Sequence, residues 1–257
     1  MGGESVVRTT IDHLVGGVYR IATVDRAASV SFNQFLIDDE LPMLVHTGEH
    51  GHYEHIRAAI EQVLDPARLA YIALLHFEGD ECGGMDRFMS QAPQAQLVAS
   101  ALSSVLNLAR FPWRHRVLSV QEDDAIQLGN HSLRVLETPH VHHWDSMMLV
   151  EETTRSLFPS DLFLQPGDQP PVVRENLAGE MCSYYRHAGI FASERPVVSL
   201  LDRIEPLEPA WAHAMHGGSI PADALQPYLR ALREQPFAYN DSLFGRRIEQ
   251  SREHADS

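Results

Sequence analysis

Three potential metal ligands occur at every second position where an apolar run of the sequence ends. His76, Glu78 and Asp80 follow the apolar segment 69–75, and Glu81 comes directly after Asp80. If the apolar segment is a buried strand, its alternate residues point to the same side, so an imidazole and two carboxylates would face one space. Such side chains are common ligands of transition metals, and a solvated acidic loop is the alternative interpretation. The rest of the chain favours the metal site.

Three later segments also place histidine or acid where an apolar stretch ends. A lone aspartate there is more often a capping or turn residue, and a lone histidine is more often structural. Four such segments in one chain nevertheless indicate a shared site. The later candidates are His140, His142 and His143 in the segment 139–146, Asp161 after 156–158, and His216 after 211–215.

Strands and helices alternate in the first part of the chain, strands dominate the middle, and helices return near the end. Periodicity and turn residues predict these elements. No linker divides the chain, so we expect one domain over 1–257, with two αβ layers packed sheet to sheet, a core at about 13–235 and a polar tail at 249–257. The expected elements are a strand pair at 13–21, strands at 31–37 and 43–48, a helix at 52–63 stopped by Pro66, a strand at 69–75, a helix at 85–90, a strand at 96–99, a helix at 102–108 ended near Pro112, a hairpin series at 116–120, 125–128 and 133–136, a hairpin at 147–158, helices at 174–187 and 195–204, a strand at 211–215 and a helix at 221–235.

Composition excludes several classes of function. The formal net charge is −15, which argues against a nucleic-acid or anionic-membrane partner. All 20 basic residues are arginine, so lysine Schiff-base chemistry and a P-loop lysine are excluded. Cys82 and Cys182 are expected to be free thiols in a reducing compartment. Neither a signal peptide nor an apolar run of transmembrane length is present, so a cytoplasmic protein is expected.

The order of these motifs resembles that of a known family. H-x-E-x-D, a histidine followed by D-S-M, then S-D-x-F and H-G resemble the metallo-β-lactamase fold, and more narrowly the di-iron domain of flavodiiron proteins and their stand-alone oxygen-binding relatives. Glu78 replaces the second histidine of the hydrolytic members. The resemblance spans about 13–235 and includes the segment 33–37 and the pair Tyr184 and Tyr185. It implies an α/β fold, an αββα sandwich of two mixed sheets with helices on the outer faces.

The resemblance also implies which residues bind metal. Family members carry a histidine directly after the aspartate of H-x-E-x-D, where this chain has Glu81. Glu81 either ligates as a carboxylate or turns away and leaves an open position. His143 is the alternative to His142. The implied ligands are His76, Glu78 and His142 for a first iron, Asp80 and His216 for a second, and Asp161 as the bridge.

Both the ligand types and the resemblance favour iron. A set rich in carboxylates is harder than a zinc site made of histidine and cysteine, although zinc and manganese remain alternatives. The implied function is binding or reduction of O2 or NO. Because no flavodoxin-like domain follows residue 257, the electrons are expected from a separate donor protein. The alternatives are a dinuclear hydrolase acting on esters or thioesters and a non-catalytic oxygen sensor.

Residues near the ligands complete the expectations. Tyr184, Tyr185 and His143 are candidate catalytic residues, and Asp145 is a candidate partner that orients a histidine. His46 stands where related hydrolases often have aspartate in a D-T-G turn, so it is expected close to the site. Family members often dimerise, and the resemblance therefore implies a homodimer.

Overall fold

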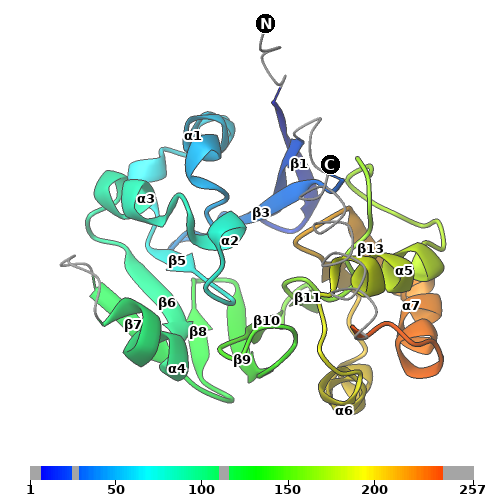
Figure 1. Cartoon of the computed structure of the whole chain (residues 1–257). Helices are drawn as coiled ribbons and strands as arrows, with labels where there is room; N and C mark the ends of the chain where they lie inside the picture. The colour runs from blue at the N-terminus through cyan, green and yellow to red at the C-terminus, as the bar shows by residue number, and fades with distance from the viewer. Residues whose placement is uncertain (1–6, 25–28, 110–115, 240–257) are drawn as a thin grey trace, which may run out of the picture.

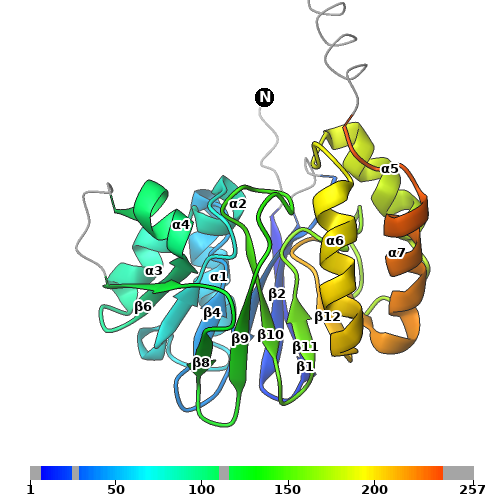
Figure 2. The ribbon, with the colours of Figure 1, turned by 90° about the horizontal axis from the view of Figure 1, so that it is seen from below.

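The chain folds into four layers, two β-sheets packed face to face with helices outside each. The computed structural model describes residues 7–24, 29–109 and 116–239. Figure 1 shows the chain in colour from the N-terminus to the C-terminus, and Figure 2 shows the two sheets between two groups of helices. The αββα sandwich expected from the sequence is confirmed.

Within the described residues, the first sheet contains seven strands, in the order of the sequence. Its first four strands are antiparallel, and β4 to β7 are parallel to one another. The sheet is therefore mixed. Its strands are β1 (Arg8–Val15), β2 (Val18–Val24), β3 (Phe32–Ile37), β4 (Met43–Val45), β5 (Tyr71–Ala73), β6 (Gln96–Ser100) and β7 (Arg116–Val120).

The second sheet has six strands in the part of the chain that the structure describes, in the order β13-β12-β11-β10-β9-β8. Among its described strands, only β11 and β12 pair in parallel, and the helices α5 and α6 lie between them in the sequence. The strands are β8 (Ala125–Gln127), β9 (Ser132–Glu137), β10 (Met147–Glu151), β11 (Ser156–Phe158), β12 (Trp211–His213) and β13 (Ser219–Pro221).

The helices cover the outer face of each sheet. None of the helices in the described ranges is long and apolar enough to cross a bilayer. Helices α1 (Tyr53–Ile60) and α3 (Met85–Gln91) pack on the first sheet, and α5 (Ala178–Ala188), α6 (Arg195–Ile204) and α7 (Ala222–Glu234) pack on the second. The remaining turns are η1 (His50–His52), η2 (Pro66–Arg68), α2 (Gly79–Cys82), α4 (Ala101–Ser103), η3 (Ser104–Leu108) and η4 (Glu205–Leu207).

Alternating side chains along the central strands build three apolar clusters. In β4, Leu44 faces the helices of the first sheet, whereas Met43 and Val45 face the second sheet. In β10, Leu149 faces the first sheet and Met148 faces helices α5 to α7. Strands buried on both faces read as continuous apolar runs, which explains why the sequence shows little alternation there.

The structure corrects four of the expected elements. The segment 116–120 does not join the hairpin series, because β7 pairs in parallel with β6 at the edge of the first sheet. The helix expected at 174–187 begins only at Ala178, and the one at 102–108 is the short α4 followed by the wider turn η3. The strand expected at 211–215 ends at His213 and is followed by the unexpected β13. Pro112 and the tail at 249–257 lie outside the described residues.

A buried histidine between the sheets should make the fold sensitive to acid. His213 is buried, and its ring nitrogens lie 2.9 Å from Oγ of Ser219 and 3.0 Å from Oγ of Ser156. Burial lowers the pKa of His213 from 6.5 to about 3. Between these values the unfolded chain binds a proton that the folded chain does not, so stability falls as the pH is lowered through this window.

We expect His213→Gln to remove this acid sensitivity while keeping hydrogen-bonding capacity for both serines. Between about pH 7 and about pH 5, the unfolding free energy of the wild type should fall by about 2 kcal/mol more than that of the variant. Urea denaturation at several pH values would measure both losses. Equal losses in the two proteins would show that His213 does not titrate in this way.

Candidate metal centre

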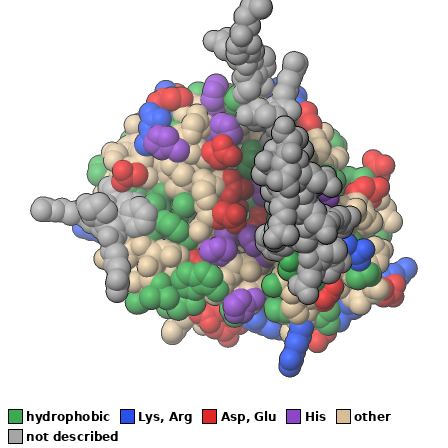
Figure 3. All heavy atoms as spheres, in the orientation of Figure 1, with side chains coloured by type: hydrophobic (Ala, Val, Ile, Leu, Met, Phe, Trp, Pro, Cys, Tyr) green, Lys and Arg blue, Asp and Glu red, His purple; other side chains and the backbone are tan. Residues whose placement is uncertain are grey.

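Four segments that are distant in the sequence meet at one edge of the two sheets. His76 and Glu78 follow β5, Asp161 follows β11, His216 follows β12, and the loop between β9 and β10 supplies His142. Their side chains converge because these strands end on the same side of the sandwich. Acidic and histidine side chains gather along the middle of the face seen in Figure 3. The structure therefore brings together the strand-end residues that the sequence singled out.

The first group consists of His76, Glu78, His142 and Asp161, whose ligand atoms all lie within 4.8 Å of one another. Nε2 of His142 lies 2.8 Å from Oδ2 of Asp161 and 3.2 Å from Oε2 of Glu78. Nε2 of His76 lies 3.4 Å and 3.2 Å from the same two oxygens. Two imidazoles and two carboxylates that face one point suit a divalent transition metal.

The second group consists of Asp80, Glu81 and His216, again with ligand atoms within 4.8 Å of one another. Nε2 of His216 lies 3.6 Å from Oδ2 of Asp80 and 3.3 Å from Oδ1 of Asp161. Asp161 thus turns Oδ2 towards the first group and Oδ1 towards the second. This arrangement allows one carboxylate to bridge two cations.

Hydrogen bonds fix the orientation of two of the imidazoles. Nδ1 of His76 lies 2.8 Å from Oγ of Ser160, and Nδ1 of His216 lies 2.9 Å from the carbonyl oxygen of Ser31. Each bond leaves Nε2 directed at the centre, as is usual for histidine ligands of metals. Ser160 belongs to the S-D-x-F motif, but the sequence assigns it no contact with His76, and no motif contains Ser31.

Glu81 turns into the centre, which decides between the two orientations considered for it. It is fully buried, and the backbone N–H and the hydroxyl of Thr47 both donate to its carbonyl oxygen. Among the residues that the structure describes, no hydrogen-bond partner reaches either of its carboxylate oxygens or Oδ1 of Asp161. Burial and the charges of Asp161 and Asp80 raise the pKa of Glu81. Cations bound here would offset the negative charge of these buried carboxylates, so the residues present fit a metal pair.

A helical turn, not an extended strand, presents Asp80 and Glu81. The alternation expected through Asp80 is wrong, because Glu78 is extended but Gly79–Cys82 forms α2. A Cβ on Gly83 would lie 2.5 Å from the backbone of both Gly79 and His50, and one on Gly84 would lie 2.5 Å from the carbonyl oxygen of Thr47. The two glycines therefore allow α2 to pack against the loop that follows β4.

Charges within the first group are balanced by protons. Hydrogen bonds from His142 and His76 lower the pKa of Glu78. Burial by itself would lower the pKa of His142, but its hydrogen bonds with Asp161 and Glu78 outweigh this effect and raise the pKa to about 10. A metal ion that binds here must therefore displace a proton from His142.

The structure separates the three neighbouring histidines by position. His142 belongs to the first group, whereas His140 is exposed. Nδ1 of His143 lies 2.6 Å from Oδ1 of Asp145, and the ring of His143 lies 5.5 Å from that of His76. Asp145 thus orients His143, not His142, and His143 lies beside the centre without joining either group.

The two tyrosines differ in what their hydroxyls contact. Tyr185 is buried, and its hydroxyl donates to the carbonyl oxygen of Asp161 at 2.7 Å while accepting from the N–H of Leu164 at 3.1 Å. It therefore holds the loop that carries Asp161. The hydroxyl of Tyr184 lies 3.1 Å from Oγ of Ser29 at the wall of a cavity.

A cavity of about 320 Å³ opens onto both groups. Apolar side chains form part of its wall, so a small apolar gas molecule can lie against the ligands. The residues around it are Ser29, Val30, Phe32, Glu78, Asp80, His142, Asp161, Leu164, Tyr184, Ile190 and His216.

Asn33 fixes the loop that carries His216. Its side-chain amide donates to the carbonyl oxygens of Ala214 and Gly217 at 2.9 and 2.7 Å. Arg20, which is buried, donates to the Asn33 side chain at 3.1 Å and to the Gly217 carbonyl at 2.7 Å. The polar residue within the apolar segment 33–37 therefore positions a candidate ligand.

The two cysteines lie outside the centre. Both are free thiols, as expected, and burial raises the pKa of each to about 11. Neither thiol is therefore activated as a nucleophile.

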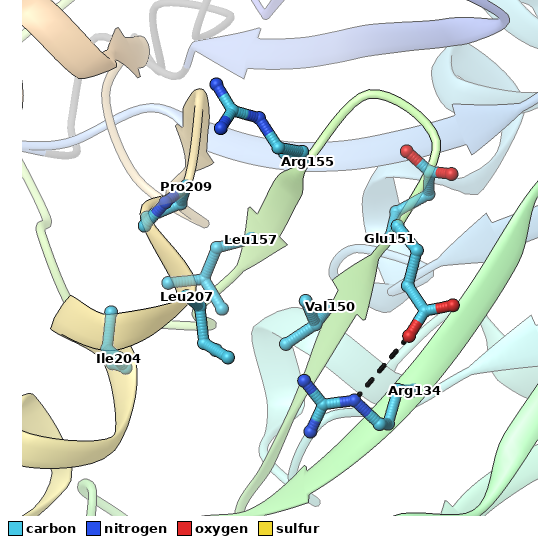
Figure 4. Close-up of a pocket in the computed structure, with 9 residues that line it drawn as sticks. Arg134, Val150, Glu151, Arg155, Leu157, Ile204, Leu207 and Pro209 are labelled. Atoms are coloured by element: carbon cyan, nitrogen blue, oxygen red, sulfur yellow. Dashed lines mark ion pairs between the residues drawn. The ribbon is translucent and has the colours of Figure 1, made fainter.

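A second cavity, of about 220 Å³, lies at the other end of β10 and β11, beside α6. In Figure 4 the side chains of Leu157, Leu207 and Val150 lie between the guanidinium groups of Arg155 and Arg134. None of its lining residues belongs to the two metal groups. The cavity beside the ligands is therefore the one that bears on their chemistry.

Comparison with known proteins agrees with this geometry. Flavorubredoxin, an anaerobic nitric oxide reductase of Salmonella arizonae, is 32% identical over 139 residues, which are 52% of this chain and 29% of that protein. A putative diflavin flavoprotein A 1 of Thermosynechococcus vestitus is 28% identical over 212 residues, which are 79% of this chain and 36% of that protein. The chain thus spans about a third of the length of these curated relatives.

Solved structures share the fold. The rubredoxin oxygen:oxidoreductase of Desulfovibrio gigas superposes with a TM-score of 0.79 at 19% identity, covering 88% of this chain and 62% of that one. A fragment of a putative diflavin flavoprotein A 5 of Nostoc sp. PCC 7120 gives 0.75 at 16% identity, covering 88% and 97%. The model of the family described as ODP family beta lactamase matches residues 30–217, well over half of the chain. The chain therefore belongs to the ODP family of β-lactamase-fold proteins.

Proposed function

We propose that this protein is a non-haem di-iron protein that binds and reduces O2 or NO with electrons from a separate donor protein. The observation that carries the proposal is the position of Asp161 between the two groups of potential ligands. His76, Glu78 and His142 would hold the first iron, and Asp80, Glu81 and His216 would hold the second. Asp161 would bridge them.

The chemistry of the donor set supports iron. Four carboxylates and three imidazoles meet at the centre, and anionic oxygen ligands favour a harder, more oxidisable metal than zinc. When bound, the iron pair would supply electrons to the gas molecule. The relatives named for nitric oxide reduction and for oxygen reduction support both substrates. The name of the Desulfovibrio protein includes rubredoxin, which supports a protein as the electron donor.

The protein's own residues would bind the gas molecule, exclude water from the cavity and hold the metal ligands in place. Val30, Phe32, Leu164 and Ile190 give the cavity an apolar wall, which favours a small apolar ligand over water. Tyr184 faces this cavity and would hydrogen-bond to the bound molecule. Tyr185 would act by holding the Asp161 loop. His143, oriented by Asp145, would donate a hydrogen bond beside the centre.

The proposed function is tested by turnover of the iron-loaded protein. We expect O2 or NO to be consumed catalytically when a small iron–sulfur protein of rubredoxin type, kept reduced, is supplied as the donor. Binding of O2 without turnover would favour the sensor. Zinc-dependent cleavage of thioesters with no consumption of either gas would favour the hydrolase and contradict the proposal.

The assembly of the protein is part of the same proposal. A homodimer is implied by resemblance to the family. Sedimentation at micromolar concentration should therefore give twice the mass of the chain, and a single chain under these conditions would contradict the homodimer.

A further inference from the structure

Two polar side chains are buried beside the metal centre without a hydrogen-bond partner. Gln34 is completely buried and His46 is 2% exposed. Both amide atoms of Gln34 and both ring nitrogens of His46 lack a partner within the described residues. Buried polar groups are nearly always hydrogen-bonded to protein or to ordered water, because an unpaired buried group costs about 1–3 kcal/mol. Two adjacent exceptions therefore require a physical explanation.

Gln34 and His46 are neighbours across two strands. Phe35 of β3 pairs with Val45 of β4 in an antiparallel register, and Gln34 and His46 are the next residues beyond this last pair. Gly48 lies beside Gln34, because a Cβ at this position would lie 3.2 Å from Nε2 of Gln34. Gln34 and His46 thus both lie at the end of β4.

His46 also has an unusual backbone conformation. Its φ is +65°, in the left-handed region that side chains other than glycine rarely adopt. Such strain persists only where the surrounding structure enforces it, and it occurs most often at functional sites. Glycine would adopt this conformation without steric cost.

The region borders the metal centre. The ring of His46 lies 6.1 Å from the ring of His76, whose Nε2 lies 3.4 Å from Oε2 of Glu81. The residue after His46, Thr47, donates two hydrogen bonds to the carbonyl oxygen of Glu81. No hydrogen bond from the described part of the chain reaches the carboxylate of Glu81. The unpartnered atoms of His46 and those of Glu81 thus both lie near His76.

We propose that Gln34 and His46 bind ordered water on the inner side of the metal centre, and that this water hydrogen-bonds to Glu81 and positions its carboxylate. Water is the ligand that fits, because it donates and accepts at once and satisfies small buried polar sites. A single bridging water joins groups that are too far apart for a direct bond. The role of Glu81 rests on the proposed di-iron centre, but the water site itself does not.

The direct test is a crystal structure at a resolution that shows ordered water, for both metal-free and metal-loaded protein. We expect water within hydrogen-bond distance of the Gln34 amide and the His46 ring in both states. In the loaded state a water should also contact Glu81. A space without water beside both side chains would overturn the proposal, and this result does not depend on whether the centre binds iron.

The positioning role is tested by titrating Mn²⁺ into anaerobic protein. We expect Gln34→Leu to weaken binding of one of two ions about 10-fold to 100-fold, the usual effect of removing a group that supports a ligand. Leu36→Met, a volume-conserving change on the same face of β3, is the matched control and should leave both affinities within about twofold.

Two outcomes of this titration are decisive. If Gln34→Leu raises the Tm of the metal-free protein and leaves both Mn²⁺ affinities unchanged, the amide does not serve the centre and the positioning role is overturned. Gln34→Met provides a second variant of similar shape if Gln34→Leu does not fold. If the wild type binds no second Mn²⁺, the proposed centre fails instead, and the crystallographic test still decides the water site.

Discussion

Asp161→Asn is expected to abolish binding at both groups, because each of its carboxylate oxygens faces a different set of ligands. The amide keeps the shape of the side chain but cannot bridge two cations with negative charge. Removing a group that merely supports a ligand costs about 10-fold to 100-fold in metal affinity, so loss of the bridge should cost at least about 100-fold for each ion. Metal content after gel filtration would measure this loss.

Asp145→Asn is the matched control for this change. Asp145 is a buried aspartate close to the centre, but it contacts His143 and Asn107 and belongs to neither group of potential ligands. The variant should retain both metals. If Asp145→Asn loses metal as completely as Asp161→Asn, or if Asp161→Asn loses only one ion, Asp161 is not the bridge.

Glu81→Gln is expected to remove one metal and leave the other. Glu81 belongs with Asp80 and His216, so the first group keeps all its residues in this variant. Loss of one anionic ligand should weaken binding of the second ion by at least about 100-fold. Glu81→His, which introduces the histidine that the family resemblance implies at this position, should retain both ions. Two tightly bound metals in Glu81→Gln would show that Glu81 is not a ligand.

Glu81→Gln should also be more stable than the wild type when no metal is bound. Burial raises the pKa of Glu81 above its value in the unfolded chain. The unfolded chain therefore releases this proton at a lower pH than the folded chain does. Glu81 therefore does not reduce the stability of the folded chain below the unfolded pKa, near 4.5. As the pH rises above this value, the unfolding free energy falls.

Glu81→Gln lacks this penalty, so we expect its unfolding free energy without metal at neutral pH to exceed that of the wild type by at least about 1 kcal/mol. Urea denaturation in the presence of a chelator would measure the difference. With metal bound, the order of stability should reverse, because the wild type gains more binding energy. A variant that is less stable in both states would contradict the account.

The segments that carry the candidate ligands can be found in the sequence because each is a local pattern. H-x-E-x-D at 76–80, the histidine cluster at 140–143 and the acid at 161 all occur at strand ends, and their order resembles that of one family. The choice between His142 and His143 and the direction of Glu81 depend on side-chain orientation. Only the folded chain shows that His143 pairs with Asp145 and that Glu81 is buried.

Residues that support the ligands were harder to predict, because their partners are distant in the sequence. Asn33 and Arg20 contact Gly217, almost 200 residues away. A signal was nevertheless present, since Asn33 and Gln34 are polar residues inside a segment that otherwise reads as a buried strand. The sheet to which β7 belongs could not be inferred, because strand pairing across sheets leaves no local pattern.

The central claim is that the seven side chains of the two groups hold a pair of iron ions. Metal analysis of the purified protein tests this claim most directly. The chain should be expressed without added metal, purified without a metal-affinity step, and analysed by mass spectrometry of the elements together with Mössbauer spectroscopy. The account predicts two iron ions per chain, one for each group, with the magnetic coupling of a bridged pair. Two zinc ions per chain and no iron would contradict it.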